Sequence, residues 1–219
     1  MAKKIMLNDK YGLTKAVLDG RKTQTRRVIQ QSEMDKINLF QKEYYELTFD
    51  KLEGAELINH YYFVEKRGRL PYQIGEVVAV AQSYCSIADE LENCNNATCA
   101  AHYEKNAQKA SEYISWMEHP GFNNKLFVAA DMMPHKIRIT DVRVERIQDI
   151  SDEDCIKEGV RKVVNENGIY IQYYVGKGDN ACCFENPREA FAHLINKVSR
   201  KDVWEENPYV FVYDFELIK

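Results

Sequence analysis

The stretch GRKTQTRRVI, residues 20 to 29, gathers basic and hydroxyl side chains in a chain that is acidic overall. The basic side chains of this cluster are Arg21, Lys22, Arg26 and Arg27. The chain carries 30 Lys and Arg against 34 Asp and Glu, a net charge of −4, so no global field attracts a polyanion and any phosphate site must be local. The cluster has enough charge for a few phosphate contacts, but a solvated surface strand would have the same composition.

A second group of residues has the types that bind zinc. In CNNATCAAH, Cys94, Cys99 and His102 could start a zinc site, with Cys182 or Cys183 as the fourth ligand. The C-x4-C spacing is loose for a structural zinc site and the chain has no second C-x-x-C pair, so ordinary reduced thiols are the favoured interpretation. We expect no metal and no cofactor.

The overall composition indicates a folded chain that stays in the cytoplasm. Its 219 residues, 45% of them hydrophobic, suffice for one good core. No apolar stretch approaches the roughly 20 residues that a membrane-spanning helix needs, and MAKKIMLNDKYG lacks the apolar core of a signal peptide.

Local patterns in the first half predict the elements next to the basic cluster. A short helix is expected over residues 11 to 19, with Gly20 as its left-handed stop. YQIGEVVAVAQSY, residues 72 to 84, begins with a turn at Ile74 and Gly75 and continues as a buried strand.

Two segments of the first half are poorly specified. Residues 30 to 70 are polar with aromatic groups, and we interpret them as an excursion that ends in a strand near residues 61 to 64. Residues 85 to 125 are interpreted as an insertion that could carry a helix from 89 to 117.

The second half has a strand whose apolar phase slips. In HKIRITDVRVERI, Ile137 and Ile139 alternate in one phase, and Val142 and Val144 continue in the opposite phase. A slip between them implies a bulge or bend, as a small barrel needs where a strand turns a corner.

Two capped helices and a strand follow. The first helix starts at Ser151, has acidic residues in its first turn, and stops at Gly159; Cys155 lies on its apolar face. Asn186 and Pro187 open the second helix, and PYVFVYDFELI alternates as a strand. Since alternating βαβ units are absent, we predict an α+β fold, a small β-barrel of mixed sheet with flanking helices, formed by residues 1 to 219 as a single domain with the two insertions.

Four motifs, taken together and in order, resemble the ASCH domain family of the PUA-like superfamily, in the form found in prophage and gut-bacterial proteins. They are GRKTQTRRVI, YQIGEVVAVAQSY, MPHKIRITDVRVERIQDISDEDCIKEGV and the closing PREAFAHLINKVSRKDVWEENPYVFVYDFELI. The resemblance implies a PUA-like barrel with a cleft and a function related to RNA.

The resemblance also implies a chemistry. The chain is similar to the small bacterial members that act as N4-acetylcytidine amidohydrolases. Those members use a lysine, a threonine and a glutamate, and the matching residues of this chain are Lys22, Thr25 and Glu158. Many prophage relatives carry W-V-R-E-T-W where this chain has VAVAQSY, so Ala81 and Gln82 replace a charged pair.

The residue types permit that chemistry. The neighbouring arginines disfavour the protonated form of Lys22, which makes a lysine available as a base. A neutral Lys22 could take the proton of the Thr25 hydroxyl and so create a nucleophile toward an acyl carbon. Glu158 could protonate the leaving amine or orient water, and backbone amides of residues 20 to 26 could stabilise the oxyanion.

Three hypotheses therefore remain open. In the first, the chain binds RNA, a nucleotide or a modified nucleoside without chemistry, through Arg21, Arg26, Arg27 and His135, although His135 could equally be a satisfied loop histidine. It could instead be a hydrolase of a modified cytidine or of RNA that uses the residues matched above. The third hypothesis is a phage-derived module that binds another protein.

Overall fold

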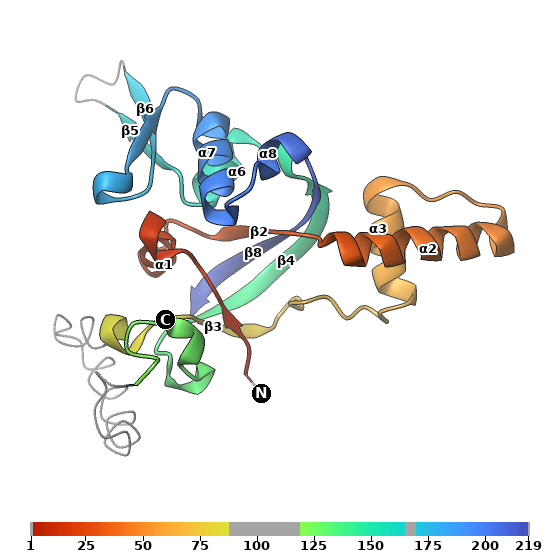
Figure 1. Ribbon diagram of the computed structural model, residues 1–219, viewed down its shortest axis with the longest axis horizontal. Coiled ribbons are helices and arrows are strands. Elements are labelled where there is room, and N and C mark those ends of the chain that lie inside the picture. The colour runs from red at the N-terminus through yellow and green to blue at the C-terminus, as the bar shows by residue number, and fades with distance from the viewer. Residues whose placement is uncertain (1, 88–118, 165–169, 219) are drawn as a thin grey trace.

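The computed structural model describes residues 2–87, 119–164 and 170–218 (Figure 1). The strands are β1 (Lys4–Ile5), β2 (Gln24–Val28), β3 (Val77–Val80), β4 (Lys136–Arg146), β5 (Arg161–Val164), β6 (Ile171–Val175), β7 (Cys182–Phe184) and β8 (Tyr209–Ile218). The α-helices are α1 (Leu13–Leu18), α2 (Gln31–Thr48), α3 (Gly54–Val64), α6 (Asp152–Lys157), α7 (Pro187–Ser199) and α8 (Val203–Glu206). The 3-10 turns are η1 (Asp9–Tyr11), η2 (Lys125–Phe127), η3 (Ala130–Met132), η4 (Ile147–Asp149) and η5 (Gly178–Asn180). The α+β class predicted from the sequence is confirmed.

A five-stranded mixed sheet forms the centre of the fold. Its strand order is β1-β3-β4-β8-β2, with β1 parallel to β3 and the other pairs antiparallel. Strand β8 lies between β4 and β2, and Val210, Val212 and Tyr213 are fully buried because both faces of this strand are covered. Among the described strands β1 and β2 remain edges, so closure of the sheet into a barrel is not confirmed. Strands β5, β6 and β7 form a separate antiparallel sheet.

The bulge expected in β4 is present. Ile139 pairs with Phe215, whereas Asp141 pairs with the adjacent Asp214, so one extra residue is accommodated in β4. Before the bulge the odd-numbered side chains point into the core; after it the even-numbered ones do, and the odd-numbered Arg143 and Glu145 are turned away from the core. This reversal lets charged side chains of β4 reach the candidate site.

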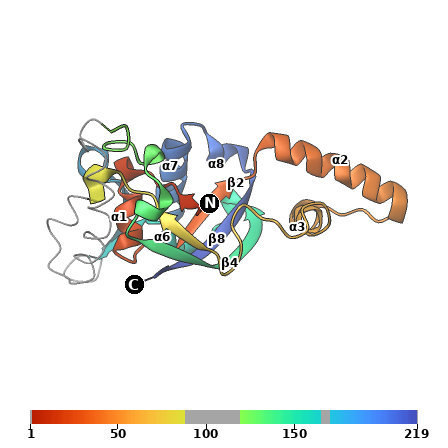
Figure 2. The same cartoon turned by 90° about the horizontal axis from the view of Figure 1, so that it is seen from below.

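Residues 31 to 64 form a helical arm of α2 and α3, so the strand predicted near residues 61 to 64 is wrong. Figure 2 shows α2 projecting away from the rest of the fold, with α3 beside it. The buried side chains of α3, which recur at helical spacing, are Leu57, Ile58, Tyr61 and Tyr62. The Tyr62 ring packs edge-on against Phe211 of β8 at 5.0 Å between centroids, which anchors α3 to the sheet.

Helices α6 and α7 begin where the sequence predicts, whereas α1 begins at Leu13, two residues after the expected start. The Ser151 hydroxyl accepts a hydrogen bond from the backbone N–H of Asp154, which caps α6, and Gly159 follows with a φ of 109°. Asn186 caps α7 and Pro187 is its first residue. The α1 helix ends before Gly20, which has a φ of 72°.

Two further expectations from the sequence are the helix within the second insertion and the lack of a membrane-spanning helix. The helix predicted from 89 to 117 lies outside the described residues. Within the described ranges, no helix combines the length and the apolar composition that a membrane span requires.

Candidate functional site

The turn between α1 and β2 holds Lys22 against the end of α6. The backbone N–H groups of Arg21 and Lys22 each donate to the Ala16 carbonyl at 2.9 Å, so the chain stays tied to α1 as it turns. The backbone N–H of Thr23 donates to the Lys157 carbonyl at 3.0 Å. Glu158 is the next residue after Lys157, and these bonds therefore bring Lys22 and Glu158 together although they are 136 positions apart.

The ammonium group of Lys22 is buried and surrounded by oxygen. Its side chain is 1% exposed, and Nζ donates to Glu158 Oε2 at 2.6 Å and to the carbonyls of Gln24 and Glu158 at 2.7 Å each. Burial lowers the pKa of Lys22; Glu158 opposes the shift, and Arg27 and Arg26 add to it. The expected direction of the shift is confirmed, but its main cause is burial and not the neighbouring arginines.

Arg26 is part of a buried ionic network around Glu158. Its guanidinium pairs with Glu158 Oε1 at 3.2 Å, with Asp154 Oδ2 at 3.3 Å, and with Glu145. Burial opposes its charge, but the carboxylates of Glu158 and Glu145 outweigh that effect and raise the pKa of Arg26. The side chain is 1% exposed. The expectation that Arg26 contacts a phosphate is therefore not supported, because carboxylates already occupy its donors.

The other residues expected to bind nucleic acid lie in different surroundings. Arg21 is exposed and pairs with Asp19 at 3.3 Å. Arg27 is half-buried and donates to the Met6 carbonyl at 2.6 Å. His135 is half-buried at the start of β4 and does not line the cavity described next. Of these three residues only Arg27 lines that cavity, and their binding of nucleic acid stays a prediction.

A cavity of about 50 Å³ brings the three matched residues together. Its polar side is lined by Lys22, Thr25, Arg26, Arg27 and Glu158. Its apolar side is formed largely by Phe191, Leu194, Ile195 and Val198 of α7. No hydrogen bond between described residues uses the Thr25 hydroxyl, so this hydroxyl is available to a ligand. The cavity has room for one or two water molecules, and a nucleobase can enter only if side chains of α7 move.

Some residues of the site were not singled out in the sequence. Glu145 and Asp154 position Arg26, and Phe191 and Leu194 close the cavity. The signal for Glu145 was the phase slip, which turns the odd-numbered residues of β4 toward the site. Nothing local marks the α7 side chains as anything but a core stripe. Ala81 and Gln82 are buried and do not line the cavity.

The expected zinc ligands cannot be placed together. Cys94, Cys99 and His102 lie outside the described residues, while Cys182 and Cys183 are unpaired thiols on β7. In the described part of the chain, no group of three or more His, Cys, Asp or Glu side chains is arranged to hold a metal ion.

Comparison with known proteins gives one distant structural likeness. The chain is similar to the crystal structure of an ASCH domain from Lactobacillus crispatus JV V101, with 11% sequence identity and a TM-score of 0.35. The alignment covers 99% of this chain and 78% of the other. The chain matches no family model and no curated protein sequence.

Proposed function

We propose that this chain is a hydrolase that removes the acyl group from an acylated amino group of a nucleobase, as in N4-acetylcytidine. One observation carries the proposal: Lys22, Thr25 and Glu158 line the same buried cavity, although Glu158 lies far from the other two in the sequence. A base, a hydroxyl and a carboxylate that line one cavity are the groups that acyl transfer requires.

The first step needs Lys22 in its neutral form. As an ammonium, Lys22 uses all three protons on the oxygens of Glu158 and Gln24. After losing one proton, the amine keeps two of these bonds and gains a lone pair, which takes the proton of the Thr25 hydroxyl. The Thr25 oxygen then forms a bond to the acyl carbon.

The second half of the reaction returns the enzyme to its starting state. The bond between the acyl carbon and the base nitrogen breaks, and the nitrogen takes the proton that Lys22 received. Water then attacks the acyl carbon and gives one proton to Lys22, which passes it to the Thr25 oxygen as the bond between that oxygen and the acyl carbon breaks. The products are the carboxylic acid and free Thr25. Arg26 holds one oxygen of Glu158 and Lys22 holds the other, so this carboxylate orients Lys22 throughout both steps.

Chromatography of the protein incubated with N4-acetylcytidine tests the proposal directly. We expect release of cytidine and acetate, and a loss of at least about 100-fold in rate for Thr25→Ala and for Lys22→Ala. Thr23→Ala is the matched control, because Thr23 lies in the same string and does not line the cavity. Its rate should stay close to that of the wild type. Turnover that survives both Thr25→Ala and Lys22→Ala, or a wild type without turnover, would contradict the proposal.

A second candidate function is binding of a nucleoside or RNA without chemistry. The observation in its favour is that the charged form of Lys22 has every proton occupied, which leaves it no lone pair with which to act as a base. Binding of N4-acetylcytidine without release of acetate at any pH would distinguish this function from the hydrolase.

A further inference from the structure

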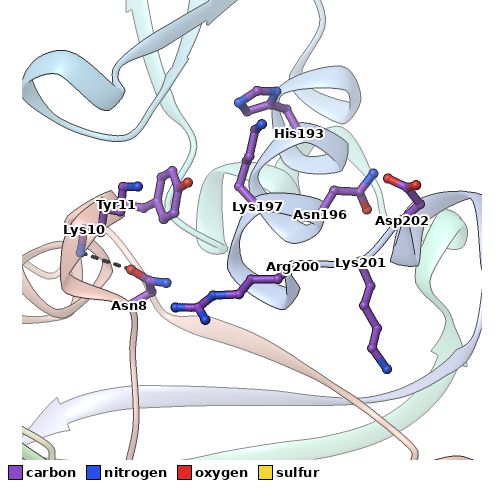
Figure 3. A pocket seen from close by; sticks show the side chains of 9 residues that line it. All are labelled: Asn8, Lys10, Tyr11, His193, Asn196, Lys197, Arg200, Lys201 and Asp202. Atoms are coloured by element: carbon purple, nitrogen blue, oxygen red, sulfur yellow. Dashed lines mark hydrogen bonds between the residues drawn. The ribbon is translucent and has the colours of Figure 1, made fainter.

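A cationic groove of about 620 Å³ lies on the outer side of α7. Figure 3 shows side chains from both ends of the chain meeting there. The cations that line it are Lys10 of η1, Lys197 of α7, and Arg200 and Lys201 directly after α7. Asp202 is the one acidic side chain among the residues that line it. We call this feature the α7 groove.

The cations of the α7 groove carry unneutralised charge. All four are exposed, and among the described residues none of them forms an ion pair. The predicted basic cluster is different, since its Lys22 and Arg26 are buried in bonds to carboxylates. Exposed cations that converge without counter-ions create a local positive potential, even in a chain of net charge −4.

Stability of the helix end does not account for this arrangement. Cations near the C-terminus of a helix interact favourably with its dipole, which would explain Lys197 and Arg200. Lys10, however, belongs to η1 near the start of the chain. Arg200 also occupies the left-handed cap of α7 with a φ of 58°, a position that glycine fills at least conformational cost. The fold thus places an arginine at a position that local stability would give to glycine.

The uncharged residues of the groove suit a nucleic acid. Tyr11 contributes a half-buried ring to the groove, with Lys10 Nζ 6.0 Å from the ring centroid, and aromatic rings are the groups on which unpaired bases stack. His193 adds no charge at neutral pH, because burial and the nearby Lys197 lower its pKa. Asn8 lines both the α7 groove and the buried cavity, so the two spaces are neighbours. Helix α7 separates them, with Leu194 on the cavity side and Lys197 on the groove side.

We propose that the α7 groove binds the phosphates of a single-stranded nucleic acid. The substrate of the site is then a modified base within a strand, and not only a free nucleoside. The second statement rests on the proposed function, whereas binding of the strand in the groove does not. Several adjacent cations match the repeated charges of such a strand, and a flexible strand can present an unpaired base to a neighbouring cavity.

Fluorescence anisotropy with a labelled single-stranded RNA of about ten nucleotides tests the groove. We expect the affinity of the wild type to fall linearly with salt on a double logarithmic plot. The double variant Lys197→Gln, Arg200→Gln should reduce the magnitude of the slope by about 1.4, because each single-strand phosphate contact contributes about 0.7. The corresponding loss of affinity is roughly tenfold at 0.15 M salt.

The matched control removes the same charge elsewhere. Lys42 of α2 and Lys136 of β4 are exposed and unpaired among the described residues, and neither lines the groove. The double variant Lys42→Gln, Lys136→Gln should retain the affinity and slope of the wild type. Equal weakening by both double variants, or no weakening by the groove variant, would overturn the inference. Displacement of the RNA by a polyglutamate peptide at equal charge concentration would also overturn the inference, because it would indicate that the partner is an acidic protein.

Different experimental results would contradict the binding of RNA in the α7 groove and the proposed hydrolase function. A wild type that hydrolyses no N4-acetylcytidine but binds RNA through Lys197 and Arg200 supports the groove and contradicts the hydrolase. A wild type that hydrolyses the free nucleoside but binds no RNA at low salt overturns the groove alone.

Discussion

The proposed chemistry depends on Lys22. The surroundings that stabilise its ammonium form must also allow this group to lose a proton. Three oxygens hold Nζ within 2.6 to 2.7 Å, whereas complete burial favours the neutral amine. The balance between these two effects sets the pH at which the amine becomes a base.

The pH profile of hydrolysis follows from the lowered pKa of Lys22. The ordinary value is 10.5, and burial shifts it downward although Glu158 opposes the change. Only the neutral amine accepts a proton from Thr25, so the rate should rise with pH through the lowered pKa and level off above it. Measuring kcat on N4-acetylcytidine from about pH 6 to pH 10 checks this. A rate that falls across that range while the protein stays folded would contradict it.

Glu158→Gln should destabilise the fold as well as the site. The change removes the carboxylate that faces Lys22 and Arg26, and leaves their buried charges less compensated. We expect the free energy of unfolding in urea to fall by about 3 kcal/mol. Glu205→Gln, at an exposed position of α8, should change it by less than about 0.5 kcal/mol. Equal stabilities of the two variants would show that the buried pair contributes little.

The sequence could identify only part of this site. Lys22 and Thr25 stand in one short string of unusual composition, so they attract attention by themselves. Glu158 matched only through the resemblance to a family. Asp154 was visible as an acidic residue in the first turn of a helix, but its contact with Arg26 depends on how α6 packs against β2.

At the scale of elements, the turn after α6 fixes the distance between the two halves of the site. Gly159 adopts a φ of 109°, a backbone conformation that residues other than glycine rarely adopt. A Cβ atom at this position would lie 3.2 Å from Leu13 Cδ2 and 3.6 Å from Lys22 Cδ. The close approach of α6 to the α1–β2 turn therefore requires glycine.

Gly159→Ala should cost about 3 kcal/mol of unfolding free energy, because backbone strain and crowding add. Gly20→Ala is the matched control: its φ is 72° and nothing lies within 4 Å of the added Cβ. It should cost only about 1 kcal/mol, the penalty of the left-handed conformation. Thermal and urea unfolding compare the two variants, and a larger loss for Gly20→Ala would contradict the crowding at Gly159.

Elements with local signals could be predicted, and those defined by long-range packing could not. The cap at Ser151, the start of α7 at Pro187 and the bulge in β4 each have a signature within a few residues. The aromatic string in α3 has the composition of a strand, but its buried positions follow helical spacing because α3 packs on α2 and on the sheet. The α7 groove had no local signature, since Lys10 and Arg200 come from opposite ends of the chain.

At the scale of the whole molecule, the helical arm is joined to the sheet through α3, while several of its apolar side chains are exposed. Leu47 and Phe49 are 83% and 81% exposed, whereas Ile58 is fully buried. One face of the arm is therefore buried in the hydrophobic core, and the other face is exposed to solvent.

Substitutions on the two faces should separate these contributions. Ile58→Ala should lower the free energy of unfolding by about 3 kcal/mol, because it leaves a cavity in the core. Leu47→Ala removes a similar side chain from an exposed position and should change it by less than about 0.5 kcal/mol. Urea unfolding of both variants checks the difference. A large loss for Leu47→Ala would mean that the outer face is covered in solution.

The position of β8 has a consequence for how the chain folds during synthesis. Strand β8 is made after β2 and β4, and it lies between them in the sheet. Until the ribosome has released β8, β2 has no partner strand and β4 has only β3. The nascent chain therefore carries the basic cluster and the turn of Lys22 unassembled until β8 has been synthesised. The site can form only after β8 has been synthesised, at the rates of about 5–20 residues per second at which ribosomes work.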